Sequence, residues 1–214
     1  MNKKMLTLAV ALLAASSSAS AAESATLEVT GTITPPPCTI GLDGTGMVNL
    51  GEIKTESLSA AVPTKLTTQS IDLSVSCPGK SQFAISAVDA RSANLVDAAV
   101  AVAKTGATSD QAFGLGSEDG QDVGAYVISL ASPITDDGSS SMITRTSGGS
   151  WSAATLLQPG DGQQTAWGSN QKVTATKDAK VTLNVDAAIA ALNGLDLSNS
   201  IDIQGQATIE LTVL

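Results

Sequence analysis

The sequence predicts an all-β protein, and three observations support that class. Residues 201–214 alternate apolar and polar side chains without a break, which is typical of a half-buried strand. Residues 25–34 show the same period of two. The rest is rich in Thr, Ser and Gly with few strong helix-forming stretches, a composition that favours short strands joined by turns. We therefore expect one domain built as a two-sheet β-sandwich.

Residues 1–21 are predicted to be a secretory signal peptide. Lys3 and Lys4 form a basic start, an apolar run follows over residues 5–15, and residues 19–21 are small enough for cleavage. The apolar run is too short to span a bilayer, which argues against a membrane anchor. Cleavage removes Lys3 and Lys4 but no acidic residue, so the mature chain has a more negative formal charge than the -9 of the full sequence. That charge argues against nucleic acid and anionic membrane surfaces as partners.

The first expected strand covers residues 25–34. Its apolar face consists of Ala25, Leu27, Val29, Gly31 and Ile33. Prolines follow at positions 35–37, and because proline has no N–H to donate, the chain must leave the sheet just before Cys38.

Cys38 and Cys77 are the only cysteines, and an exported chain passes through an oxidising compartment, so we expect a disulfide between them. Closing a loop of about 40 residues should stabilise the fold by roughly 4 kcal/mol on the chain-entropy model. A reactive or metal-binding pair is the alternative. The chain has no CxxC motif and no histidine to complete such a site.

The remaining strands are predicted at residues 47–53, 70–77, 82–88, 113–116, 123–131, 181–191 and 201–214, and the segments 70–77, 181–191 and 201–214 alternate apolar and polar side chains. Residues 98–103 could form an edge strand or a weak helical turn, and periodicity does not decide between them. The Ala-rich end of 181–191 could be helical in isolation, but the pattern around it favours a strand. Residues 201–214 would form an unusually long strand with no following hairpin to pair with it, so its partner must come from elsewhere.

We expect no enzymatic activity, no cofactor and no metal. Without histidine, the chain cannot build a Ser–His or Cys–His nucleophile pair or an imidazole metal site. Carboxylates cluster at residues 118–122 and 136–137, beside glycines, where Asp commonly bonds turn backbone; neither cluster has the spacing of a calcium loop. Trp151 and Trp167 could stack on a sugar, although the simpler interpretation is that each anchors a loop against the sandwich.

Several motifs resemble the subunits of chaperone–usher pili. Residues 27–40, LEVTGTITPPPCTI, form an alternating segment with a Gly-Thr step that leads into the first cysteine. The likeness continues through VNLGEI at residues 48–53 and IDLSVSC at 71–77, and closes with the alternating C-terminal strand. Within that broad group, FGLG at residues 113–116 and VGAY at 123–126 are similar to the fimbrial-like DUF1120 proteins of Gram-negative bacteria.

The resemblance implies an immunoglobulin-like sandwich of the pilin type (residues 35–214) that lacks its last strand and is completed by a donated one. It also implies an N-terminal extension (residues 22–34), passage through the periplasm, and display in a surface fimbria or outside the cell. The implied partners are a periplasmic chaperone, an outer-membrane usher and neighbouring fimbrial subunits. The groove would be lined by Ile203, Gly205, Ala207, Ile209, Leu211 and Val213. The donated strand would present Ala25, Leu27, Val29 and Gly31.

Two other functions remain open from the sequence. The extension before Leu27 is shorter than in typical pilins, which favours a self-complemented periplasmic or secreted sandwich whose first strand covers its last. An accessory lectin-like adhesin domain that uses Trp151 or Trp167 is the second. The unbroken alternation of residues 201–214 favours the fimbrial subunit.

Overall fold

The structure is a computed structural model that describes residues 25–33 and 37–214. The predicted signal peptide, residues 22–24 and 34 of the predicted extension, Pro35 and Pro36 lie outside these residues. The chain divides into two units, Met1–Pro35 and Pro36–Leu214. No helix in the described part of the chain is long and apolar enough to cross a membrane.

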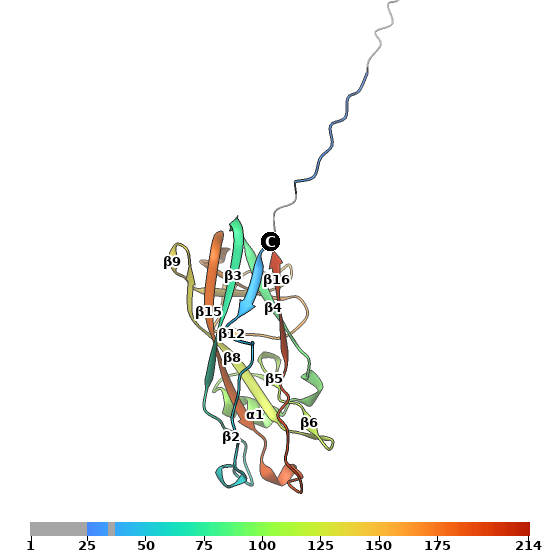
Figure 1. Ribbon diagram of the computed structural model, residues 1–214, viewed down its shortest axis with the longest axis vertical. Coiled ribbons are helices and arrows are strands. Elements are labelled where there is room, and N and C mark those ends of the chain that lie inside the picture. The colour runs from blue at the N-terminus through green and yellow to red at the C-terminus, as the bar shows by residue number, and fades with distance from the viewer. Residues whose placement is uncertain (1–24, 34–36) are drawn as a thin grey trace, which may run out of the picture. The chain divides into compact units, whose positions relative to one another are not determined.

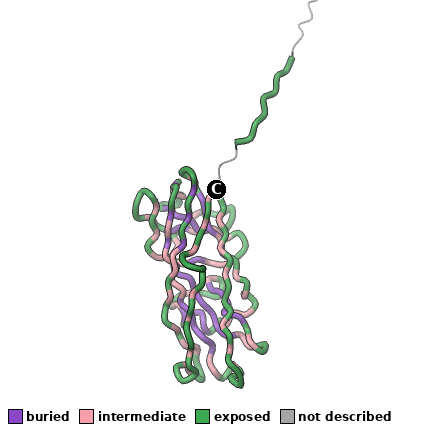
Figure 2. Tube along the Cα trace, in the orientation of Figure 1, coloured by how far each residue is buried: buried purple, intermediate pink, exposed green. Residues whose placement is uncertain are grey.

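Residues 25–33 form no strand, and all of them are exposed (Figure 2). Leu27, Val29 and Ile33 are 87%, 86% and 97% exposed. The prediction of a strand over residues 25–34 is therefore wrong for the part that the structure describes. A strand needs a neighbour for its backbone N–H and C=O groups, and no described strand pairs with this segment.

The second unit contains two sheets, with the strands labelled in Figure 1. Sheet A comprises β1 (Thr39–Leu42), β2 (Thr64–Lys65), β3 (Gln69–Ser81), β5 (Phe113–Gly114), β8 (Gly124–Thr135), β9 (Gly138–Ser139), β12 (Leu156–Leu157) and β15 (Thr176–Ile189). Sheet B comprises β4 (Phe83–Asp89), β10 (Met142–Thr146), β11 (Ser152–Ala153), β13 (Gln163–Ser169), β14 (Lys172–Val173) and β16 (Ala207–Val213). A separate hairpin joins β6 (Ser117–Glu118) to β7 (Gln121–Asp122). The helices are α1 (Asp97–Ala103) and the 3-10 turns η1 (Thr55–Ser57), η2 (Ser92–Asn94), η3 (Ser109–Gln111) and η4 (Leu192–Gly194).

The predicted all-β sandwich is confirmed. Sheet A has the order β1-β3-β15-β8-β12, and sheet B has the order β11-β10-β13-β4-β16. All pairs of named strands in these sheets are antiparallel. β1 is thus one edge of sheet A and β16 is one edge of sheet B.

The core lies between the two sheets. Leu73, Val181 and Leu183 of sheet A and Phe83 and Ile85 of sheet B belong to it and are fully or almost fully buried. The strands predicted at residues 70–77, 82–88, 123–131 and 181–191 are found as β3, β4, β8 and β15. β3 and the middle of β15 turn alternate side chains to this core, whereas residues 124–129 of β8 are all buried. The Ala-rich end of β15 is strand up to Ile189, as predicted.

Trp167 anchors the core rather than offering a ligand platform. It is 1% exposed, its ring meets Phe83 edge-on at a centroid distance of 5.6 Å, and its Nε1 donates to the carbonyl of Lys180 at 3.0 Å. Trp151 is half-buried, and the guanidinium of Arg145 lies 4.4 Å from its ring centroid, which covers one face of the ring. The loop-anchor interpretation therefore fits both side chains better than sugar stacking.

The predicted disulfide is confirmed: Cys38 and Cys77 are bonded. Cys38 immediately precedes β1, and Cys77 lies in β3, the strand that pairs with β1. The bond therefore fastens an edge strand of four residues to β3, the next strand of sheet A.

Residues 98–103 lie in the helix α1, so the edge-strand alternative is wrong. Ala99, Val100 and Ala103 are buried in a second apolar cluster with Ala125 of β8 and Ala188 of β15. Alanine has the highest helix propensity, and the helix buries its apolar side against the outer face of sheet A.

A buried carboxylate joins this outer layer to sheet A. The side chain of Asp186 is 5% exposed and lies 3.2 Å from Lys65 Nζ and 3.3 Å from Lys104 Nζ. Thr68 and Ser129 also donate to it, at 2.6 and 3.3 Å. Burial by itself would raise the pKa of Asp186, but the bonds from Thr68, Lys65 and Lys104 outweigh it and lower the pKa below 3.8.

Three of the carboxylates in the clusters noted in the sequence, Asp122, Asp136 and Asp137, bond to other residues. Asp136 accepts from the backbone N–H groups of Lys177 and Asp178, and Asp137 pairs with Lys80 at 3.0 Å. Asp122 accepts from Asn94 at 3.0 Å. The residues that the structure describes contain no group of three or more side chains suited to a metal ion.

Two predicted strands do not form as expected. Residues 47–53 have no strand pairing, and Gly51 in this segment has a φ of 73°, which interrupts an extended backbone. Residues 201–206 are likewise not strand, so β16 is half as long as the pattern indicated. Both segments keep alternate side chains half-buried, which explains why their patterns predicted strands.

Candidate functional site

β16 has one open edge. Among the described strands it pairs with β4 alone. The N–H of Ala90 donates to the carbonyl of Gln206 at 3.0 Å, and the N–H of Leu214 donates to the carbonyl of Gln82 at 2.9 Å. Gln206 lies opposite Ala90, and Leu214 lies opposite Gln82, in the antiparallel register. In such a register hydrogen-bonded pairs alternate with non-bonded pairs, so the even-numbered residues of β16 bond to β4. The backbone groups that point toward the open edge are those of Ala207, Ile209, Leu211 and Val213.

β1 presents a matching open edge on sheet A. The N–H of Asp43 donates to the carbonyl of Asp72 at 2.9 Å, which places the odd-numbered residues against β3. By the same alternation, the backbone groups of Ile40 and Leu42 point away from β3. β1, the blue arrow in Figure 1, lies beside β16 at one end of the domain. Two unpaired strand edges therefore border one gap between the sheets.

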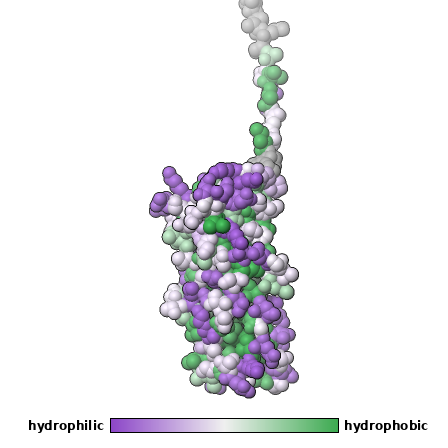
Figure 3. Space-filling model, turned by 60° about the vertical axis from the view of Figure 1, so that its left-hand side comes forward, coloured by the Kyte–Doolittle hydropathy of each residue, from purple (hydrophilic) through white to green (hydrophobic). Residues whose placement is uncertain are grey.

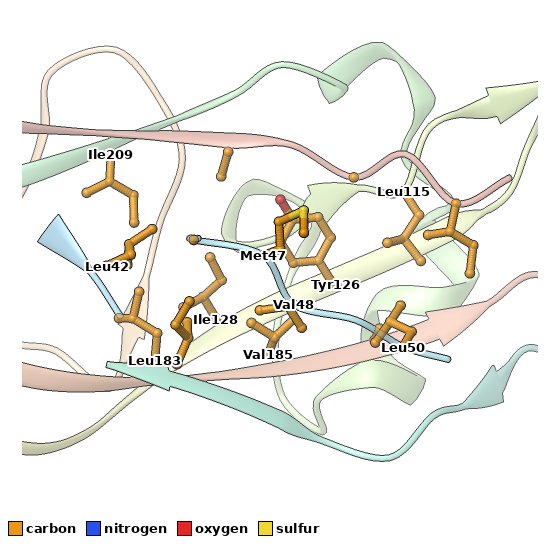
Figure 4. A pocket seen from close by; sticks show the side chains of 16 residues that line it. Leu42, Met47, Val48, Leu50, Leu115, Tyr126, Ile128, Leu183, Val185 and Ile209 are labelled. Atoms are coloured by element: carbon orange, nitrogen blue, oxygen red, sulfur yellow. The ribbon is translucent and has the colours of Figure 1, made fainter. Parts of the chain in front are cut away.

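An apolar groove of about 340 Å³ occupies this gap (Figure 4). One wall comes from residues 203–209, and the other comes from Leu42 and residues 46–50. The floor is formed by core-facing side chains of β3, β8 and β15: Ile71, Tyr126, Ile128, Leu183, Val185 and Ala187. No residue that lines this groove has a charged side chain.

The groove continues in both directions. Leu42 and Ile209 also line a cavity at the β1 end. Met47, Val48 and Ile203 also line a larger cavity of about 630 Å³ at the other end. Together these cavities form a trough along the side of the sandwich, where part of the core is left uncovered. On the face drawn in Figure 3, apolar atoms reach the surface between more hydrophilic borders.

The first part of this wall, residues 203–206, is held by backbone and side-chain groups from the β4–β8 connection. The N–H of Gln204 donates to the carbonyl of Leu115 at 3.0 Å. Arg91 donates through Nε to the carbonyl of Gln204 at 3.1 Å and through Nη2 to its Oε1 at 3.3 Å. A Cβ on Gly205 would lie 3.0 Å from the Tyr126 ring and 3.1 Å from Leu115, so only glycine fits there without a shift.

The predicted groove residues fall into two sets. Ile203, Gly205, Ala207 and Ile209 line the groove. Leu211 is half-buried and packs against the core without lining the central groove, and Val213 is 46% exposed. The predicted donor residues Ala25, Leu27, Val29 and Gly31 are all exposed.

Sequence reasoning missed the second wall. The sequence predicts a paired strand over residues 47–53, whereas the side chains of Met47, Val48 and Leu50 line the groove opposite residues 203–209. The positive φ angles of Gly46 and Gly51, 71° and 73°, mark the two ends of this segment. Two glycines around an alternating stretch were the one signal that the segment leaves the sheet.

The chemistry of this site is that of its lining and its two strand edges. The groove has apolar walls, an uncharged lining and backbone hydrogen-bonding groups along both borders, which suits an extended peptide with alternating apolar side chains.

No curated protein matches this chain. A family model does match residues 27–127: the family is described as "Protein of unknown function (DUF1120)", and it has not been characterised. The match includes the disulfide, β1, β3, β4 and α1, and it ends within β8. Residues 27–127 of the chain thus carry the sequence pattern of DUF1120.

Proposed function

We propose that this protein is a structural subunit of a surface fimbria whose sandwich is completed by a strand donated from another polypeptide. The observation that carries the proposal is the apolar groove between the open edges of β1 and β16. The proposed partners are a periplasmic chaperone, which fills the groove first, an outer-membrane usher, and a neighbouring fimbrial subunit, which replaces the chaperone.

A sandwich with an open groove leaves backbone groups unpaired and apolar side chains partly uncovered. Free strand edges invite pairing with another chain, and an added strand would satisfy the N–H and C=O groups of residues such as Ile209 and Leu211. Its alternate side chains would cover Ile71, Val185 and Ile203, which are only half-buried now. Backbone pairing would supply affinity, and the apolar lining would select alternating apolar side chains.

Residues 25–33 support a donor role for the chain itself. Leu27 and Val29 lie on one face of an alternating segment, yet both are highly exposed and pair with no described strand. Large apolar side chains are rarely left so exposed in a soluble protein unless another surface covers them. We assign this segment as the strand that the protein donates to a neighbouring subunit.

Hydrogen exchange of the mature full-length chain tests the proposal with a built-in control. Without a partner, the amides of Ile209 and Leu211 should exchange quickly, whereas those of Thr208 and Glu210, which bond to β4, should be protected. A synthetic peptide of residues 25–34 should slow the odd-numbered amides selectively. A peptide of the same sequence with N-methylated alternate amides should not, because it cannot complete the ladder.

Protection of all four amides in the isolated, monomeric chain would contradict the proposal and would indicate a self-complemented sandwich. The same distinction appears in bulk behaviour. We expect size-exclusion chromatography to recover stable mature chain from the periplasm only with a fimbrial chaperone, or as fibres. A stable monomer that ignores the chaperone in thermal melting would point to a groove that is already filled.

A further inference from the structure

Tyr126 supplies the one side-chain oxygen or nitrogen among the residues that line the central groove. It lies on β8, its ring stacks on Phe113 at a centroid distance of 5.0 Å, and the residue is only 7% exposed. In Figure 4 the Tyr126 side chain, with its hydroxyl oxygen, lies among the side chains that line the groove. A polar group is therefore held in the floor of an otherwise apolar site.

The hydroxyl bonds to none of the residues that the structure describes. Among those residues, every side-chain oxygen or nitrogen that is shielded from solvent has a hydrogen-bond partner. Because the Tyr126 hydroxyl has no such partner, it must be in contact with water, which reaches it through the open groove. Burial of the ring raises the pKa of Tyr126, which keeps the phenol neutral and able to both donate and accept a hydrogen bond.

A strand that enters the groove removes that water. If the entering side chain is apolar, the hydroxyl is covered without a partner, whereas a Ser, Thr, Asn or Gln side chain replaces the lost bond. Buried polar groups left unpaired are the strongest source of discrimination between similar ligands. The expected preference for the polar strand is about 5- to 100-fold in Kd.

The protein's own extension does not provide this group on its apolar face. The side chains that would enter a groove together are those of Ala25, Leu27, Val29, Gly31 and Ile33, and none carries an oxygen or nitrogen atom. A second copy of this chain would therefore cover the hydroxyl without pairing it.

We infer that the groove is specific for a strand from a different protein, one that carries a Ser, Thr, Asn or Gln side chain facing Tyr126, and that a second copy of this chain is the weaker ligand. This inference rests on the proposed function, because it names the partner of the same groove. Tyr126 is then the residue that determines which donated strand is accepted.

Fluorescence anisotropy with the mature full-length chain tests this. The probes are the peptide of residues 25–34 and five single variants of it, Ala25→Ser, Leu27→Asn, Val29→Thr, Gly31→Ser and Ile33→Thr. One of the polar variants should bind about 5- to 100-fold more tightly than the parent peptide. Val29→Thr is the sharpest probe because the two side chains have nearly the same shape.

The control is Tyr126→Phe, which should abolish this preference and bind the parent peptide more tightly than the wild type does. The variant should melt close to the wild type, because the lost hydroxyl bonds no described residue. Equal binding of all six peptides, or a preference for the parent over every variant, overturns the inference and leaves the proposed function standing. Binding of none of the peptides overturns both.

Discussion

The most direct test of the groove is replacement of Ile209, whose side chain lines both the central groove and the cavity at the β1 end. It is half-buried in the free domain, and an added strand would bury the rest. Ile209→Ala removes three carbons, each worth about 0.8 kcal/mol when fully buried. Because only part of that burial occurs on binding, we expect a loss of about 1–2 kcal/mol, or roughly 5- to 30-fold in Kd.

Ile209→Asp should abolish binding, because the donated strand would cover a carboxylate with no partner. The matched control is Thr208→Asp, which places the same charge one residue earlier on the exposed face of β16. The assay is co-purification with a fimbrial chaperone, together with anisotropy of the labelled 25–34 peptide. Thermal melting must show that each variant is folded. Wild-type binding by folded Ile209→Asp, or an equal loss in Thr208→Asp, would refute the assignment of this groove as the strand-receiving site.

Two further predictions concern the fold around the groove. Asp186→Asn should lower the free energy of unfolding at pH 7 by about 1–3 kcal/mol, because Lys65 and Lys104 lose a buried charged partner. The folded-state pKa of Asp186 is lowered, so its stabilisation is complete above the ordinary value of 3.8 and is lost as the pH falls through the folded-state pKa. Urea unfolding should show a constant gap between wild type and variant at pH 5–8 that shrinks below about pH 4, and a gap independent of pH would contradict this. Gly205→Ala should cost about 1–2 kcal/mol in the same assay, because its Cβ meets Tyr126 and Leu115, whereas Gly194→Ala, with open space around it, should be near neutral; equal costs would argue against this packing.

Much of the fold could be predicted from local patterns in the sequence. The alternation of residues 207–213 predicted a half-buried strand, and β16 has its odd-numbered side chains inward up to Leu211. Cys38 and Cys77 could be paired from their number and compartment alone. The candidate site was partly readable for the same reason, because Ile203, Gly205, Ala207 and Ile209 share one face of an extended segment whether or not it is paired.

The same local pattern failed where no neighbour was present. Residues 25–33 alternate as clearly as β16, and residues 47–53 were also predicted to be a strand, yet neither segment is one, because a ladder requires backbone groups from a distant part of the chain. The pattern of residues 98–103 is compatible with both a strand and a helix. The segment is a helix because its apolar side packs against the alanines of β8 and β15 on the outer face of sheet A.

Side-chain periodicity is a property of one segment, so the sequence by itself determined which residues face inward and which class of fold they build. Pairing and enclosure are properties of segments far apart in the chain. Only the tertiary structure therefore decided that β1 and β16 both keep an open edge, that residues 46–50 form the opposite wall, and that the hydroxyl of Tyr126 lies in the floor between them.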